Sequence, residues 1–223
     1  LKLLQPGASE VLRARFRREA TALARLDHPN LVGLLDFGQE GERPWIAMRK
    51  VEGQTLEDVL RYGPLPPEQV AQIGASLCRA LSAVHGAGLL HRDLKPENVI
   101  RAADGAITLT DFGLTKDLEI EASVALSRTG AIQGTPGYWA PEQASGKGKH
   151  ATPATDIYGL GATLYALLTG KPPAEGSTFL EIVIATRERS PERPSATGVE
   201  VPEWLEEIVL RALAKEPQER FES

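Results

Sequence analysis

The chain has 223 residues, of which 42% are hydrophobic and 25% are charged, and its formal net charge is −5 at pH 7. This composition is that of a globular protein long enough to bury a core, and its mild acidity argues against nucleic acid or an anionic membrane as the main partner. A single cysteine, Cys78, excludes an internal disulfide, and no signal peptide or apolar run of the about 18 residues that span a membrane is visible, so we expect a cytoplasmic protein.

The first part of the chain predicts one helix followed by two strands. Residues 11–26 have an amphipathic, arginine-rich and alanine-rich pattern, and Glu19 borders its apolar stripe. That stripe consists of Phe16, Ala20, Leu23 and Ala24. Short apolar runs at 31–35 and 45–48, separated by the polar residues 38–42, predict a pair of antiparallel strands.

After about residue 53 the pattern becomes mainly helical. Residues 55–60 predict a short helix, and Pro66 and Pro67 open a longer one that ends at 86–88. The apolar stripe of the longer helix consists of Val70, Ile73, Leu77, Leu81 and Val84.

The next segment predicts a β-hairpin in which Val99–Ile100 pairs with Ile107–Leu109 across a tight Asp104-Gly105 turn. If these two residues alone form the turn, the numbers of paired positions sum to 209, and Asn98 faces Asp111. Their Cβ atoms would then lie about 5 Å apart. An amide oxygen and a carboxylate at that distance could share Mg²⁺, which prefers one or two protein oxygens together with phosphate oxygens and water.

The remainder predicts a loop and two helices. Residues 115–135 are small and polar and lack periodicity, which indicates a long mobile loop. The apolar segment near 156–169 predicts a buried helix because it is too short to span a membrane. An amphipathic stripe over 204–213 predicts the last helix.

Two short stretches carry the chemistry. Asp93 lies five residues before Asn98, with Lys95 between them. A carboxylate there could accept a hydroxyl proton while the lysine neutralises a transferring phosphoryl group. The stretches HRDLKPENVI (91–100) and TDFGL (110–114) together resemble the catalytic loop and magnesium loop of eukaryotic-like protein kinases, and the resemblance runs essentially from end to end of the chain.

The resemblance implies a nucleotide site for ATP and Mg²⁺, with Asn98 and Asp111 as the metal ligands. Lys2 resembles the lysine that holds the α- and β-phosphates, and Glu19 resembles its ion-pair partner on the first helix. The remaining residues that it places at the nucleotide are Met48 at the gatekeeper position, Val51 at the adenine-contacting hinge, and Ile100.

Further positions match the same family. The segment Gly134–Glu142 resembles the substrate-docking loop, and residues 27–32 have the form that follows the first helix. Asp156 resembles the aspartate that anchors the catalytic loop. Arg220 is similar to the arginine that pairs with the glutamate of the docking loop, which here is Glu142.

The resemblance also implies an α+β, bilobal fold. Residues 1–52 correspond to a partial small lobe and residues 53–223 to a mostly helical large lobe. The glycine-rich loop and the first strands of the small lobe would precede Lys2, and the last helix would continue beyond Ser223, so we expect a chain truncated at both ends. Whether the truncated chain is itself active stays open.

The expected activity is phosphoryl transfer to serine or threonine hydroxyls of proteins. Lys95, two residues after Asp93, and Thr135 resemble the serine/threonine type, in a style similar to bacterial kinases. In the family an arginine such as Arg92 receives a phosphate on the loop that follows, and we expect autophosphorylation at Ser127 or Thr129.

Two other functions stay open. One is a pseudokinase or scaffold, or an inactive fragment because the glycine-rich loop is absent. Against the pseudokinase argues the retention of five site residues, namely Lys2, Glu19, Asp93, Asn98 and Asp111. The other is a small-molecule phosphotransferase on a related fold, against which the docking loop at Gly134–Glu142 argues.

Overall fold

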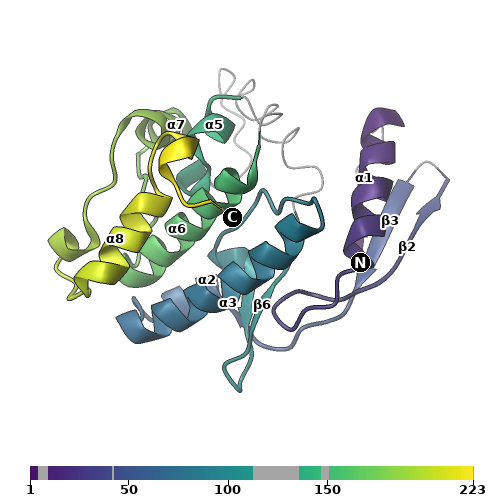
Figure 1. Ribbon diagram of the computed structural model, residues 1–223, viewed down its shortest axis with the longest axis horizontal. Helices are drawn as coiled ribbons and strands as arrows, with labels where there is room; N and C mark the ends of the chain where they lie inside the picture. The colour runs from purple at the N-terminus through teal and green to yellow at the C-terminus, as the bar shows by residue number, and fades with distance from the viewer. Residues whose placement is uncertain (5–9, 42, 113–135, 147–150, 223) are drawn as a thin grey trace.

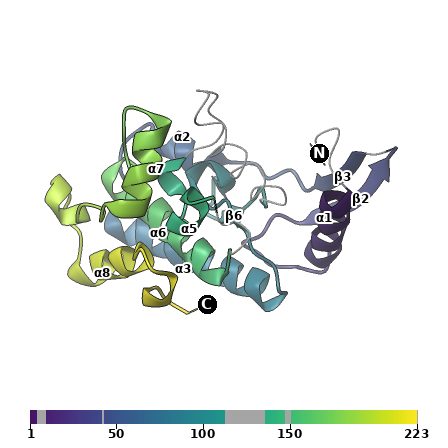
Figure 2. The same ribbon diagram turned by 90° about the horizontal axis from the view of Figure 1, so that it is seen from above.

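The computed structural model describes residues 1–4, 10–41, 43–112, 136–146 and 151–222. The fold is of the expected α+β class, and Figures 1 and 2 show one helix and a small sheet at one end of the molecule, set apart from the other helices. The division at residues 52 and 53 stays a prediction. None of the helices within the described ranges is long and apolar enough to cross a membrane.

The small lobe contains one helix and a three-stranded antiparallel sheet. Its elements are β1 (Lys2–Leu3), α1 (Glu10–Leu23), β2 (Leu34–Glu40) and β3 (Arg43–Met48). The strand order is β1-β3-β2, so the apolar β3 is central and the more polar β2 lies at an edge. The predicted antiparallel pair is therefore confirmed, but β2 starts later than expected and includes Gly38–Glu40, which the sequence placed in the connection.

Helix α1 packs its apolar stripe against this sheet. Phe16, Ala20 and Leu23 are buried as predicted, whereas Ala24 is exposed because the helix ends at Leu23. Glu19 is only 4% exposed, which means that a carboxylate is enclosed on the same face as the apolar side chains.

The large lobe is mostly helical. Its helices are α2 (Leu56–Leu60), α3 (Pro67–Gly86), α5 (Pro141–Ala144), α6 (Pro153–Thr169), α7 (Phe179–Glu188) and α8 (Glu203–Ala212). Single 3₁₀ turns are η1 (Pro96–Asn98), η3 (Pro136–Tyr138), η5 (Pro194–Thr197) and η6 (Pro217–Glu219). Proline at the first helical position starts α3 where the sequence predicted, and all five residues of its predicted stripe are buried.

Helix α6 forms the centre of the large lobe. Thirteen of its residues are buried, and it contacts both α3 and α8. The approach to α8 is close, since a Cβ on Gly161 would lie 2.7 Å from the Cβ of Ala212. The segment near 156–169 is therefore the buried helix that its composition predicted, and its N-terminal turn carries Asp156.

A second sheet consists of β4 (Gln54–Thr55), β5 (Val99–Arg101) and β6 (Ile107–Leu109). The predicted hairpin between β5 and β6 is present, but its register was predicted wrongly. The numbers of paired residues sum to 208 and not 209, because Ala102 and Ala106 also pair. The loop therefore has three residues and ends in Gly105, whose φ is +86°. Such loops place glycine in the left-handed conformation that other residues rarely adopt.

Candidate active site

The backbone of the predicted catalytic loop is held by Asp156, which is 1% exposed. Its carboxylate accepts hydrogen bonds from the backbone N–H groups of His91 (2.8 Å) and Arg92 (2.7 Å), and Nε2 of His85 donates to it at 2.8 Å. Arg92 has a φ of +66°, an uncommon conformation for a residue with a side chain. A buried carboxylate thus holds the loop in a strained backbone conformation, and the expected contact of Asp156 is present.

His91 connects this loop to the second predicted stretch. Its Nε2 donates to the carbonyl oxygen of Thr110 at 2.8 Å, and its ring lies 5.1 Å from that of Phe112. Burial lowers the pKa of His91, which favours the neutral ring. Because Nε2 carries the proton, Nδ1 can accept from the backbone N–H of Asp93, at 3.4 Å.

Asp93 and Asn98 lie together. Nδ2 of Asn98 donates to the backbone oxygen of Asp93 at 2.7 Å and to its Oδ2 at 3.2 Å. Because the nitrogen side of the amide faces Asp93, the amide oxygen of Asn98 is turned away from that carboxylate. Nζ of Lys95 forms an ion pair with Glu97, a partner that the sequence did not suggest.

The structure corrects the expected position of Asp111. Because the hairpin has the 208 register, the residue that pairs with Asn98 is Thr110, whose N–H donates to the Asn98 carbonyl at 2.8 Å. Asp111 follows with a φ of +54°, and its carboxylate is half exposed. The left-handed backbone changes the direction of the chain at this residue, so Asp111 does not face Asn98 across the hairpin as expected.

The expected ion pair between Lys2 and Glu19 is not formed. Nζ of Lys2 donates to the carbonyl oxygen of Phe112 at 3.0 Å and lies 3.7 Å from Oδ1 of Asp111. Oε1 of Glu19 accepts from Arg92 at 2.9 Å and from Arg15 at 3.1 Å. Lys2 therefore lies at the second stretch, while Glu19 lies at the catalytic loop.

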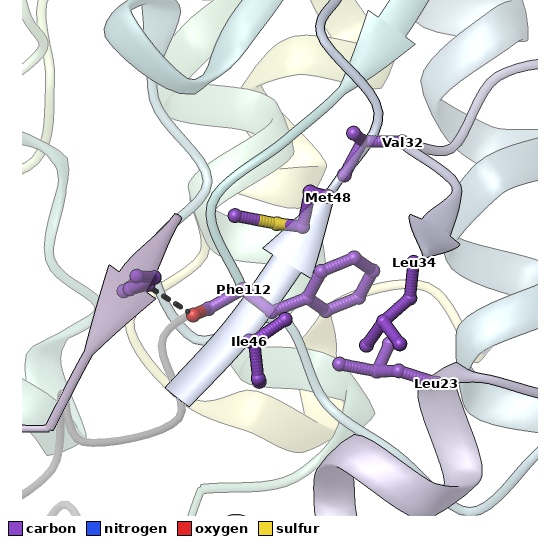
Figure 3. A pocket seen from close by; sticks show the side chains of 7 residues that line it. Leu23, Val32, Leu34, Ile46, Met48 and Phe112 are labelled. Carbon is purple, nitrogen blue, oxygen red and sulfur yellow. Dashed lines mark hydrogen bonds between the residues drawn. The ribbon is translucent and has the colours of Figure 1, made fainter. Parts of the chain in front are cut away.

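Met48 lies at the end of β3 and lines a cavity of about 10 Å³, which is room for about one water molecule. Lys2 and five apolar residues complete the lining: Leu23, Val32, Leu34, Ile46 and Phe112. Figure 3 shows the Phe112 ring directed among these apolar side chains. The cavity is nearly filled, so Phe112 packs the second stretch against the small lobe.

Val51 and Ile100 are partly exposed on the two segments that follow β3 and η1. Val51 lies between β3 and β4, and Ile100 lies in β5, where it pairs with Thr55 of β4. Their expected contact with adenine stays a prediction.

The described part of the expected docking segment runs through η3 and α5. Arg220 is 3% exposed, and its guanidinium donates to both carboxylate oxygens of Glu142, at 2.9 and 3.0 Å, so the predicted ion pair is confirmed. Thr155 of α6 also donates to Glu142, at 2.8 Å. Burial raises the pKa of Glu142, but the hydrogen bonds and charge of Arg220 outweigh it and hold that pKa below its usual value.

Several predictions concern residues outside the described ranges. These are the loop at 115–135, with Ser123, Ser127 and Thr129, and the first two residues of the docking segment, Gly134 and Thr135.

Sequence reasoning missed two polar residues of this region, His85, which is partly buried, and Gln143, which is buried. Gln143 is 3% exposed and contacts both the docking segment and the catalytic loop. It lies three residues after the N-cap of α5, where a capping box has its Glu or Gln, but the N-cap is Ala140 and not Ser or Thr, so the sequence lacks the full capping-box signal.

The donor set fits Mg²⁺. The amide oxygen of Asn98 and the carboxylate of Asp111 are hard oxygen ligands, and both follow the loop that carries Asp93. Within the described ranges, no cluster of three or more histidine, cysteine, aspartate and glutamate side chains could hold a metal by itself.

Comparison with known proteins finds one protein family that matches nearly the whole chain. The family model described as protein kinase domain matches residues 2–223. The serine/threonine-protein kinase PknB of Mycobacterium leprae is 37% identical over 238 residues, a match that covers 100% of this chain and 38% of PknB. Three of the most similar curated relatives are covered over 30%, 38% and 53% of their length, so this chain spans about a third to a half of them.

Solved structures agree with this result. The PknI kinase domain of Mycobacterium tuberculosis, as a C20A mutant, superposes with a TM-score of 0.74 at 31% identity, over 100% of this chain and 79% of that one. Rad53 in complex with AMP-PNP superposes with a TM-score of 0.76 at 27% identity, over 92% of this chain and 51% of that one.

Proposed function

The chain belongs to the protein kinase family, and we propose that the protein containing it transfers the γ-phosphoryl group of ATP to serine and threonine hydroxyls of proteins. The names of its relatives support the serine/threonine type, and the bound AMP-PNP of Rad53 supports ATP as the donor. We further propose a cytoplasmic signalling role in a bacterial cell, by analogy with the bacterial relatives.

The observation that carries the proposal is the contact between Asp93 and Asn98 beside the segment of Asp111. The 2.7 Å hydrogen bond from Asn98 to the Asp93 backbone fixes the loop on which the proposed base lies. In the resulting arrangement, Asp93 accepts the proton of the acceptor hydroxyl, and Lys95 offsets charge on the transferring group.

Asn98 and Asp111 would hold Mg²⁺, which when bound neutralises charge on the nucleotide phosphates. The Lys2 amine already lies 3.7 Å from Oδ1 of Asp111, so the proposed phosphate-binding lysine is next to the proposed metal ligand. Met48, Val51 and Ile100 are the proposed neighbours of the adenine.

Glu19 supports a closer approach of Lys2 in the working enzyme. Its Oε2 is buried and has no hydrogen-bond partner among the described residues, which costs stability in the arrangement seen here. We propose that this oxygen receives the Lys2 amine when nucleotide is bound, while the lysine also contacts phosphate oxygens. The comparisons do not favour the pseudokinase alternative, and the proposed base, phosphate-contacting lysine and metal ligands are all present in the chain.

Removal of the Asp111 carboxylate is expected to abolish the magnesium-dependent part of ATP affinity. In the full-length protein, Asp111→Ala should bind ATP in magnesium at least about tenfold more weakly than the wild type, which corresponds to about 1.4 kcal/mol. In excess EDTA the two proteins should bind ATP similarly. Isothermal titration with and without magnesium measures both values.

Asp104→Ala is the matched control, since Asp104 is an exposed carboxylate in the loop of the same hairpin. It should keep the magnesium-dependent affinity. Wild-type affinity of Asp111→Ala in magnesium would contradict the assignment of this metal ligand.

We also propose autophosphorylation at Ser127 or Thr129, with Arg92 as the residue that binds the phosphate. Arg92 donates to Glu19 in this structure, so a phosphate would compete with that carboxylate for the guanidinium. Mass spectrometry of the active protein is expected to find phosphate at one of these two positions. An active protein with no phosphate between residues 115 and 135 would refute this proposal.

A further inference from the structure

Gln143 of α5 connects two segments that the proposed reaction uses. Its Oε1 accepts from the backbone N–H of Ala140 at 3.1 Å, and its Nε2 donates to the carbonyl oxygen of Arg92 at 2.9 Å. This orientation of the amide is fixed by its partners, because an N–H can only donate and a carbonyl oxygen can only accept. The side chain is 3% exposed, so both hydrogen bonds lie away from bulk water.

The carbonyl of Arg92 belongs to the peptide group whose N–H is that of Asp93. Asp156 holds the N–H of Arg92 at 2.7 Å, and Gln143 holds its carbonyl, so the residue with the strained φ of +66° is fixed on both sides. The N–H of Asp93, on the other side of the same peptide group, donates to Nδ1 of His91 over 3.4 Å. The hydrogen bond from Gln143 to the Arg92 carbonyl therefore helps to fix the orientation of the Arg92–Asp93 peptide.

A small enclosed space supports this local arrangement. Arg92, Asp93, Gln143 and Asp156 line one cavity of about 10 Å³, no larger than one water molecule. Loss of the Gln143 amide would leave the Arg92 carbonyl without this donor in an enclosed place, which is unfavourable for the conformation seen here.

We propose that Gln143 is a positioning residue for Asp93. Its amide joins the docking segment at Ala140 to the peptide group before Asp93, and so sets the direction in which the proposed base projects. The inference rests on the proposed kinase function. It adds a residue outside the motifs that identify the site, and it explains why a side chain with both a donor and an acceptor occupies this position.

Two substitutions separate the two hydrogen bonds. Gln143→Glu keeps an acceptor for Ala140 but replaces the donor to Arg92 by a carboxylate oxygen, whereas Gln143→Met has a similar length and loses both bonds. Gln72→Glu is the control, because it makes the same chemical change at an exposed position of α3.

The experiment uses the full-length protein and two measurements. Steady-state phosphate transfer to a generic basic protein gives kcat and the KM for ATP, and hydrogen–deuterium exchange gives the protection of the amides of residues 91–94. We expect Gln143→Glu and Gln143→Met to lower kcat by about tenfold, the equivalent of one hydrogen bond, with the KM for ATP changed by less than about twofold. In both Gln143 variants the amides of residues 91–94 should exchange faster, while those of α6 exchange at the wild-type rate. In Gln72→Glu the amides of residues 91–94 should also exchange at the wild-type rate.

Wild-type kcat in both Gln143 variants, or a lower kcat with unchanged exchange at 91–94, would overturn the inference. A loss explained by the fraction of unfolded protein alone would also overturn it. If instead the wild type transfers no phosphate, the proposed function fails, and the exchange measurement still decides whether Gln143 holds the peptide of Asp93.

Discussion

Replacement of Asp93 by alanine is expected to lower kcat for phosphate transfer by about 10²- to 10⁴-fold, the range that a positioned general base contributes. The backbone oxygen of Asp93, which accepts the shorter of the two hydrogen bonds from Asn98, remains in alanine. The loop and the proposed metal ligand should therefore stay in place, and the affinity for magnesium ATP should change little.

The comparison needs kcat with a protein acceptor and the dissociation constant for ATP, both measured on the full-length protein. Asp104→Ala removes an exposed carboxylate from the nearby hairpin loop and is expected to keep wild-type values. Normal turnover of Asp93→Ala would show that another group accepts the proton.

Replacement of Arg220 by alanine is expected to cost about 3–5 kcal/mol of unfolding free energy, as is typical when one partner of a buried ion pair is removed. Arg220 joins three segments of the chain, since it donates to Glu142, to the Ala154 carbonyl and to the carbonyls of Ala214 and Lys215. Among the described residues, its loss leaves the mostly buried carboxylate of Glu142 with Thr155 as the remaining side-chain donor.

The pH dependence of this loss follows from the pKa of Glu142. Burial alone raises that pKa, but Arg220 lowers it below the usual value in the folded wild type. Ion-pair stability is therefore present above the unfolded pKa of about 4.3 and is lost as the pH falls through the folded pKa. In Arg220→Ala the effect of burial on this pKa is opposed more weakly, by hydrogen bonds such as that from Thr155, so the folded pKa should rise and acidification should relieve the destabilisation.

Denaturant unfolding of both proteins at several pH values tests this prediction. The difference in unfolding free energy should be largest near neutral pH and should shrink below about pH 5. Arg61→Ala is the control, because Arg61 forms an exposed ion pair with Asp58, and such pairs contribute at most about 1 kcal/mol. Equal stabilities of the wild type and Arg220→Ala at pH 7 would contradict the importance of the pair.

The elements that local sequence patterns specify could be predicted well. Pro66 and Pro67 mark the start of α3, and the spacing of its apolar residues determines which face is buried. The apolar composition of α6 likewise predicts burial on nearly all sides. These properties depend on neighbouring residues and on the local period, so one sequence is sufficient to infer them.

Features that depend on one extra residue or on a distant partner were not predictable in this way. In a two-residue Asp104-Gly105 loop Ala106 would pair with Ala103, whereas in the observed three-residue loop it pairs with Ala102. That difference shifts the register of the hairpin by one residue. The partner of Glu19 similarly depends on tertiary packing: the family resemblance indicated Lys2, whereas Glu19 accepts hydrogen bonds from Arg92 and Arg15 in the structure.

The central claim is that Asp93, Asn98 and Asp111 act together on a nucleotide held by a magnesium ion. Transfer of radiolabelled phosphate from ATP, measured with the full-length protein acting on itself and on a generic basic protein, tests it most directly. We expect labelled phosphoserine or phosphothreonine in the presence of magnesium and none after chelation. Transfer that persists without a divalent cation, or no transfer with magnesium present, would contradict it.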